Sequence, residues 1–275
     1  MFVANHPNLM LDVLLLGAPV PGAVPRFLGK STLSKRRMYA FFLKHLGMIP
    51  LARSQDEDTR LGRNQDMLRA AGQVLKSGHS LALFPEGSSQ APRRVRPLKP
   101  GAARIALRAL DESAADVCIV PVGLAYADPE HFRSDVAIHF GTPIEVRPFL
   151  TAYRRNRAAA ASELTEVIHQ RLVDLTWHVQ DANLETLIGD LSCVYGGQVF
   201  NALADAPDSS RSLRAGQEII QAVHHYTDHD PQLVHNFAAR LRRYRRKLQR
   251  LNLAPQVLAN DRSGSFKHAL LTFLC

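Results

Sequence analysis

The chain has 275 residues, 46% of them hydrophobic and 21% charged, which excludes a disordered or fibrous protein and allows one large domain or two smaller ones. Its formal net charge of +9 at pH 7 favours an anionic partner, namely nucleic acid, acidic lipid headgroups or a phosphorylated substrate. Three widely separated cysteines without a Cys-x-x-Cys pair predict neither a disulfide framework nor a zinc site, so we expect a reducing compartment.

Short β-rich runs alternate with helical patterns up to about residue 148, which predicts helices packed on a largely parallel sheet. One helix is expected over residues 59–76, with Gly78 just beyond its end, and another over residues 101–109. Cys118 falls within an apolar run, so we expect a buried small hydrophobe rather than a nucleophile. The predicted strands are 2–4, 26–28, 48–51, 80–84, 117–122 and 136–140.

Beyond residue 151 the β signals vanish, and the composition predicts three or four helices separated near residues 206–207, 230–231 and 254–255. We therefore expect an α/β domain over residues 1–150, with a largely parallel central sheet flanked by helices, and a helical C-terminal region over residues 151–275. No apolar run reaches the roughly 20 residues that a membrane-spanning helix needs. Because the chain opens on a strand-like run and ends in an apolar one, we expect flanking segments at both ends.

Two clusters in the helical region could bind a partner. Four histidines lie close together, but no His-Glu-x-x-His spacing accompanies them, and we expect no metal. A basic run over residues 240–248 carries Leu241, Tyr244 and Leu248 at helical spacing. It could lie on anionic lipid, or its apolar side could pack on its own domain beneath a solvated basic face. The histidines are His224, His225, His229 and His235.

The segment from Asn5 to Asp12 is the first candidate for chemistry. His6 leaves a predicted strand just before a helix, and Asp12 follows within reach. A carboxylate can hold one imidazole nitrogen as a donor and leave the other free to accept a proton from a hydroxyl. The alternative is a surface histidine and an aspartate in the first turn of a helix.

The segment Phe84-Pro85-Glu86-Gly87-Ser88-Ser89 ends an apolar strand with a turn, at the end where ligand clefts of α/β sheets lie. Gly87 allows close backbone approach, and Ser88 and Ser89 can donate hydrogen bonds to a phosphate or hydroxyl. An ordinary strand-to-loop turn is the alternative.

Arg53 follows another short predicted strand, and its guanidinium suits bidentate phosphate binding. A solvated arginine paired with Asp56 or Glu57 is the alternative for this residue.

Taken in order, four segments resemble the sequence blocks of the glycerol-3-phosphate and 1-acyl-glycerol-3-phosphate (lysophosphatidate) acyltransferase family, and a fifth match follows at residues 98–107. Four blocks in sequence order are far more specific than any one of them. The helical half adds a softer match to a fungal-type glycerol-3-phosphate acyltransferase-like branch. The four blocks are Asn5-His6 with Asp12, residues 47–53, residues 84–87 and residues 120–124.

The resemblance implies an O-acyltransferase of phospholipid biosynthesis. His6 would be the general base, Asp12 would orient it, and no acyl-enzyme would form. The acceptor would be a phosphorylated glycerol and the donor an acyl thioester, acyl-CoA or acyl carrier protein, with no other cofactor. Substrate contacts would come from Arg53, Glu86, Gly87, Ser88 and Ser89, with Pro121 shaping the cleft and Lys30 and Lys99 as weaker candidates.

Two departures from the commonest family pattern matter. His6 and Asp12 enclose five residues instead of four, which rotates Asp12 by about 100° on a regular helix unless the loop at Pro7 and Asn8 absorbs the extra residue. The five-residue spacing also resembles a fungal and bacterial branch. Ser89 stands where many lysophosphatidate acyltransferases carry arginine, which favours glycerol 3-phosphate over lysophosphatidate as the acceptor.

Other classes of protein compete with an active acyltransferase. A lipid-binding protein that keeps the fold without catalysis is one alternative. A nucleic-acid-binding module would explain the arginine run, but no zinc-finger, RNP-like or helix-turn-helix signature accompanies it, so we expect no nucleic acid partner. The basic charge and the substrate class together predict association with an anionic membrane at its cytoplasmic face.

Overall fold

The computed structural model describes residues 1–8, 11–17, 24–30, 49–51, 68–89, 93–113, 116–126, 136–179, 181, 184–191 and 210–251, with only the backbone described for 28–30, 49–51, 113, 210–212, 214, 215 and 249. Contacts divide the chain into two compact units. The first comprises residues 1–90, 95–124 and 140–175, and the second comprises residues 91–94, 125–139 and 176–275.

The centre of the fold is a sheet whose strands run in the order β3-β2-β4-β1-β5-β6, with the short β7 beside β5. Strand β1 is parallel to β4 and to β5, and β2 is parallel to β3 and to β4. The predicted α/β class is therefore confirmed, as are all six predicted strands. The two-residue β7, antiparallel to β5, is too short to give a sequence signal. The strands are β1 (Phe2–Ala4), β2 (Arg26–Lys30), β3 (Ile49–Leu51), β4 (Leu81–Leu83), β5 (Cys118–Tyr126), β6 (Val136–Phe140) and β7 (Ile144–Glu145).

One expectation about strand β5, the burial of Cys118, is wrong. Cys118, expected to be buried, is exposed. It is the first residue of β5 and faces the opposite side of the strand from the buried Ile119, because successive side chains alternate between the two faces. A hydrophobic run therefore predicted the strand but not the burial of its first residue.

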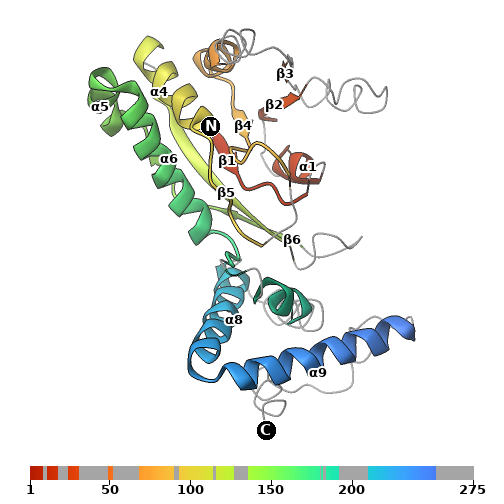
Figure 1. Cartoon of the computed structure of the whole chain (residues 1–275). Coiled ribbons are helices and arrows are strands. Elements are labelled where there is room, and N and C mark those ends of the chain that lie inside the picture. The colour runs from red at the N-terminus through yellow and green to blue at the C-terminus, as the bar shows by residue number, and fades with distance from the viewer. Residues whose placement is uncertain are drawn as a thin grey trace, which may run out of the picture. The chain divides into compact units, whose positions relative to one another are not determined.

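Helices cover both faces of this sheet. Figure 1 shows α4, α5 and α6 against one face and α1 on the other. The helix predicted to end at residue 76 is described over residues 68–76. It stops in a Schellman motif: Gly78, at φ +74°, donates to the Leu75 carbonyl, and His79 donates to the Val74 carbonyl. These helices are α1 (Leu11–Gly17), α4 (Gly101–Ser113), α5 (Leu150–Arg155) and α6 (Arg157–Asp174), preceded by the 3-10 turn η2 (Arg147–Phe149).

The first unit continues well past residue 150, where the α/β domain was expected to end. Asn156 caps α6, accepting from the backbone N–H groups of Ala158 and Ala159 at 3.1 Å each. The buried side of α5 and α6 joins the same hydrophobic cluster as β1, β4 and α4. The loss of β signals near residue 150 therefore marks a change of secondary structure inside the first unit. Core residues from these two helices are Tyr153, Ala160, Ala161, Leu164, Ile168 and Leu172.

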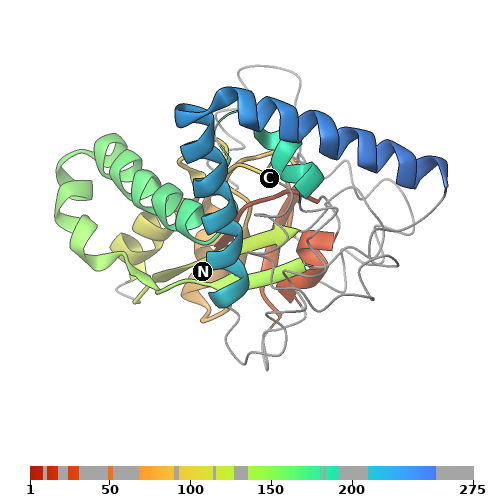
Figure 2. The same ribbon diagram turned by 90° about the horizontal axis from the view of Figure 1, so that it is seen from below.

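The second unit is mainly helical. It contains a helix over residues 184–191, α8 (Ser210–His229) and α9 (Pro231–Arg250), and the last two meet at the predicted break near residue 230 (Figure 2). Asp230 caps α9 by accepting from the Leu233 N–H at 2.9 Å. The other two predicted breaks lie outside the described residues. No helix in the described ranges is long and apolar enough to cross a membrane.

Candidate active site

The predicted pair of His6 and Asp12 is brought together in the structure. His6 lies just after the end of β1, Asp12 is the second residue of α1, and His6 Nδ1 lies 2.8 Å from Asp12 Oδ2. The Asn8 N–H donates to the same carboxylate oxygen at 2.7 Å. Both side chains are buried, so little water competes for the contact. The loop at residues 7–8 therefore does absorb the extra residue between histidine and aspartate.

An aromatic contact also restricts the orientation of the His6 imidazole ring. The Phe84 ring stacks on it, with centroids 4.0 Å apart and 13° between the planes, and the Phe27 ring lies 6.5 Å from Phe84. Because a carboxylate only accepts, the pairing with Asp12 favours the tautomer with the proton on Nδ1. His6 Nε2 is then the nitrogen that can accept a proton from a hydroxyl.

Asn5 ties the end of β1 to β5, a contact that the sequence did not suggest. Its side-chain amide donates to the Leu124 carbonyl at 3.0 Å, and its carbonyl oxygen accepts from the Leu124 N–H at 2.7 Å. Both bonds are buried. They fix the backbone directly before His6, so the histidine leaves the sheet at a defined point.

Glu86 follows β4, and its buried carboxylate lies beside His6. The carboxyl ends of the parallel β1 and β4 share one edge of the sheet, which explains why two segments far apart in sequence meet there. Burial raises the pKa of the Glu86 carboxyl above its usual value, and Arg96 and a hydrogen bond from the His6 backbone oppose that rise. Glu86 is thus linked directly to the backbone of the candidate base.

Arg96 is the functional candidate that the sequence analysis missed. Its Nε and Nη2 atoms donate to Glu86 Oε2 at 2.8 and 2.6 Å, Nη1 donates to Ser88 Oγ at 2.8 Å, and Nη2 also donates to the Ser88 carbonyl. The guanidinium therefore holds the whole turn that carries Glu86. A cation ten positions after a buried carboxylate was the available signal, but it lay among neighbouring arginines.

The turn after Glu86 gathers three more predicted residues. Gly87 has φ +76°, a conformation that favours glycine, and its N–H donates to the Phe84 carbonyl at 3.1 Å. A Cβ at Gly87 would lie only 2.7 Å from Lys99 Nζ, so the lysine crosses directly over this glycine. Ser88 and Lys99 are exposed, and Ser89 is half-buried. The turn thus presents hydroxyls and an ammonium group next to Glu86.

The remaining predicted residues lie apart from this cluster or outside the description. Pro121 is buried in β5 opposite Val3, and its carbonyl accepts from Gly141 at 2.9 Å. The backbone of Lys30 pairs with Leu51 at the end of β2, while its side chain is not described. Arg53 lies outside the described residues.

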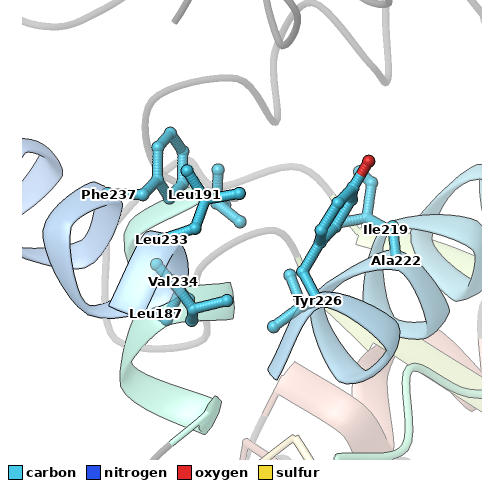
Figure 3. A pocket seen from close by; sticks show the side chains of 9 residues that line it. Leu187, Leu191, Ile219, Ala222, Tyr226, Leu233, Val234 and Phe237 are labelled. Atoms are coloured by element: carbon cyan, nitrogen blue, oxygen red, sulfur yellow. The ribbon is translucent and has the colours of Figure 1, made fainter. Parts of the chain in front are cut away.

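The helical unit offers no comparable chemistry among its described residues. A hollow in it is lined only by apolar side chains and Tyr226 (Figure 3). No group of three or more metal-ligating side chains occurs in the described ranges. His225 and His229 instead stack on each other, with centroids 4.1 Å apart. The candidate active site is therefore the cluster in the first unit: His6, Asp12, Phe84, Glu86, Gly87, Ser88, Arg96 and Lys99.

Comparison with known proteins points to one family. The Acyltransferase family model matches residues 1–125. An uncharacterised acyltransferase of Schizosaccharomyces pombe is 30% identical over 185 residues, which cover 65% of this chain and 26% of that protein. Glycerol-3-phosphate O-acyltransferase 1 of Saccharomyces cerevisiae is 36% identical over 118 residues, which cover 42% of this chain and 15% of the yeast enzyme.

A solved structure gives a weaker likeness. The 1-acyl-sn-glycerophosphate acyltransferase of Thermotoga maritima aligns with a TM-score of 0.43 and 22% identity, over 62% of this chain and 64% of that one. The chain spans only about a quarter of the first curated relative and less of the second. His6, Asp12, Glu86 and Arg96 all lie within residues 1–125, the segment that matches the Acyltransferase family model.

Proposed function

We propose that this chain is an O-acyltransferase that moves a fatty acyl group from acyl-CoA or acyl carrier protein to a hydroxyl of glycerol 3-phosphate, in phospholipid biosynthesis. The buried contact of 2.8 Å between His6 Nδ1 and Asp12 Oδ2 carries the proposal, because it prepares an imidazole to act as a general base. The match of residues 1–125 to the Acyltransferase family model supports it.

His6 and Asp12 would act together in a single displacement. As the acceptor hydroxyl attacks the thioester carbonyl, His6 Nε2 takes its proton, and Asp12 stabilises the resulting imidazolium. The tetrahedral intermediate then expels the thiol, which receives that proton from His6. The acyl group moves from sulfur to oxygen, and His6 returns to its neutral form without an acyl-enzyme.

The turn after β4 would bind the acceptor. Ser88, Ser89 and Lys99 offer donors suited to phosphate and hydroxyl oxygens, and Gly87 allows the substrate to approach the backbone. Glu86 would accept from a glycerol hydroxyl while Arg96 balances its charge. We further propose phosphate contacts from Arg53 and Lys30 and a cleft wall at Pro121.

Two observations favour glycerol 3-phosphate over lysophosphatidate as the acceptor. Position 89, two residues after Gly87, is occupied by serine and not by arginine. Two curated relatives are named glycerol-3-phosphate O-acyltransferases, at 36% and 30% identity. The reaction would take place at the cytoplasmic face of a membrane, where the lipid product of the reaction would reside.

Acyl transfer by the purified chain tests this proposal. Labelled acyl-CoA is supplied with glycerol 3-phosphate or with lysophosphatidate in separate reactions, and acyl carrier protein replaces CoA in a second series. The variants are His6→Ala and, as a matched control, His79→Ala in the same unit, whose exposed ring lies 2.9 Å from the Ser77 carbonyl through Nδ1. Circular dichroism confirms that each variant is folded.

Labelled product with glycerol 3-phosphate, lost in His6→Ala and kept in His79→Ala, would support both the reaction and its base. Product only with lysophosphatidate would overturn the assigned acceptor and keep the reaction class. A folded wild-type chain that forms no product with any pair of substrates would overturn the proposal in favour of a catalytically silent lipid-binding protein.

A further inference from the structure

Helix α9 carries a concentration of positive charge that the proposed reaction does not use. Its sequence contains six arginines and one lysine and no aspartate or glutamate. The charges fall in its C-terminal half, from Arg240 to Arg250. Neighbouring cations on a helix repel each other, so an anionic partner would stabilise such a face.

The apolar side of α9 is already covered within its own unit. Ala238 and Leu241 are buried against Leu187 and Leu191 in one hydrophobic cluster, and Leu248, two turns beyond Leu241, is buried as well. The sequence left open whether the apolar side of this segment packs on its own domain, and the burial of Leu241 and Leu248, the two residues here called the apolar seam, confirms that it does. Because Leu241 and Leu248 are buried, the apolar residues in the basic half of α9 are not free to insert into a bilayer.

The basic side chains form a stripe opposite that seam. At about 100° per residue, Arg243, Arg246 and Arg250 lie roughly 180° around the helix from Leu241 and Leu248. The stripe consists of Arg242, Arg243, Arg246, Lys247 and Arg250, and all five residues are exposed.

Arg245 lies on α9 outside the stripe and differs from the stripe residues in its environment. It lies nearer the seam, is partly buried, and pairs with Asp190 inside the unit. The stripe residues project from the other side of a helix that supplies no carboxylate of its own. Within the described part of the chain none of the five pairs with a carboxylate, so their charge can attract an anionic partner.

We propose that this stripe is a docking surface for an anionic phospholipid bilayer. Each lysine or arginine held near an anionic bilayer strengthens binding by about fivefold, and the effect fades beyond roughly 10 Å at moderate salt. A row of five on a rigid helix supplies an attraction that needs no inserted residue. The choice of lipid over nucleic acid rests on the proposed function, whose product is a lipid.

Vesicle co-sedimentation of the full chain tests this surface. The vesicles are phosphatidylcholine alone or phosphatidylcholine mixed with phosphatidylglycerol, at low and high salt. One variant combines Arg243→Glu, Arg246→Glu and Arg250→Glu. The control combines Arg155→Glu, Arg157→Glu and Arg171→Glu, which are exposed positions of α5 and α6 in the first unit and change the net charge equally.

We expect the wild-type chain to bind the mixed vesicles and not phosphatidylcholine alone, with weaker binding at high salt. The α9 variant should bind at least about a hundredfold more weakly, while the control loses far less. Equal losses in both variants would overturn the assigned surface, since net charge alone would then explain binding. Failure of the wild-type chain to bind, or tighter binding to duplex DNA than to the mixed vesicles at equal salt, would overturn the lipid partner.

Acyl transfer separates this inference from the proposed function. With short-chain acyl-CoA and glycerol 3-phosphate, and no vesicles, the α9 variant should retain the wild-type rate, because both substrates are in solution. A folded α9 variant that loses this activity would overturn a role confined to docking. Vesicle binding through α9 by a wild-type chain that transfers no acyl group would overturn the proposed function and leave the docking surface supported.

Discussion

The two charged regions of this protein differ in how their charges are satisfied. In the first unit His6, Asp12 and Glu86 are buried, and each has a partner within hydrogen-bonding distance. On α9 the stripe residues are exposed and like-charged. Burial makes an ionic contact directional and costly to break, whereas exposure makes charges interchangeable and sensitive to salt. The first arrangement suits chemistry at defined atoms, and the second suits a diffuse anionic surface.

The largest expected effect comes from Asp12→Asn. The amide has no negative charge with which to stabilise the His6 imidazolium, and one of its orientations would turn an NH2 group towards the Asn8 N–H that now donates to the carboxylate. We expect kcat for acyl transfer to fall by about 10² to 10⁴, with KM for glycerol 3-phosphate nearly unchanged. Steady-state kinetics on protein with an unchanged circular dichroism spectrum measures this.

The α9 charge-reversal variant is the control for that measurement, since it alters far more charge, all of it on a helix of the second unit. A comparable fall in kcat for both variants would contradict the contrast between a directional and a diffuse charge region.

The second effect compares two ion pairs within the first unit. Arg96 and Glu86 have side chains only 14% and 3% exposed, whereas the Arg147 and Asp116 side chains are 64% and 82% exposed. Arg96→Met leaves a buried carboxylate without its cation, and we expect the free energy of unfolding to fall by about 3 kcal/mol. Arg147→Met should cost no more than about 0.5 kcal/mol. Urea denaturation at neutral pH measures both.

Arg96→Lys separates charge from geometry in the same experiment. An ammonium group keeps the charge but cannot reach Glu86 and Ser88 with one planar fork, so this variant should recover only part of the lost stability. If Arg96→Met and Arg147→Met cost the same, burial does not set the strength of these pairs.

The sequence predicted the parts of the fold that depend on local patterns. Six strands and the end of the helix at residue 76 were correctly expected, because apolar runs and a following glycine act over a few residues. The change of composition near residue 150 predicted helices, and α5 and α6 are helical, while their apolar residues belong to the core of the first unit. Composition reports secondary structure, while packing decides domains.

Residues of the site could be predicted only where they belong to a recognisable sequence motif. The spacing of His6 and Asp12 left their contact open, because it depends on the backbone path of residues 7–8. Arg96 lies near Arg93 and Arg94, and no periodicity distinguishes the one that turns back to Glu86. Contacts made by loops depend on backbone paths that a hydrophobic pattern does not encode.

A smaller effect is expected at Gly87, where conformation and a neighbouring charge can be separated. Gly87 and Gly78 both have positive φ, at +76° and +74°, but only at Gly87 would a Cβ meet another residue, Lys99. Alanine at either position should lower the free energy of unfolding by about 1 kcal/mol, because the left-handed conformation is strained with a side chain.

Only Gly87→Ala should also raise KM for glycerol 3-phosphate, since it displaces the Lys99 ammonium from the turn. Chemical denaturation and kinetics on the two variants measure this. If Gly78→Ala raises KM equally, a general loosening of the unit explains the effect, and the placement of Lys99 does not.

The smallest effect is a dependence of stability on pH, with opposite signs at two glutamates. Burial raises the folded pKa of Glu86 above its unfolded value, so the folded state binds the proton more tightly. Its contribution to stability is therefore fully present below the ordinary glutamate pKa of about 4.3 and is lost as pH rises through the raised value. Glu112 has a lowered pKa because Lys76 and Arg108 hydrogen-bond to it, so its contribution is present above the ordinary value and is lost as pH falls.

Comparison of Glu86→Gln and Glu112→Gln with the wild-type chain tests these signs. The free energy of unfolding is measured by urea denaturation from acidic pH, below the ordinary glutamate pKa, up to neutral pH. Above that ordinary value it should fall less steeply with rising pH in Glu86→Gln than in the wild-type chain. The difference cannot exceed about 1.4 kcal/mol per pH unit, the limit for one proton. Glu112→Gln should differ from the wild-type chain in the opposite direction and more weakly, because its carboxylate is exposed and water screens its pairs. If both substitutions changed the pH dependence of the free energy of unfolding in the same direction, the burial of Glu86 would not explain how its ionisation differs from that of a surface carboxylate.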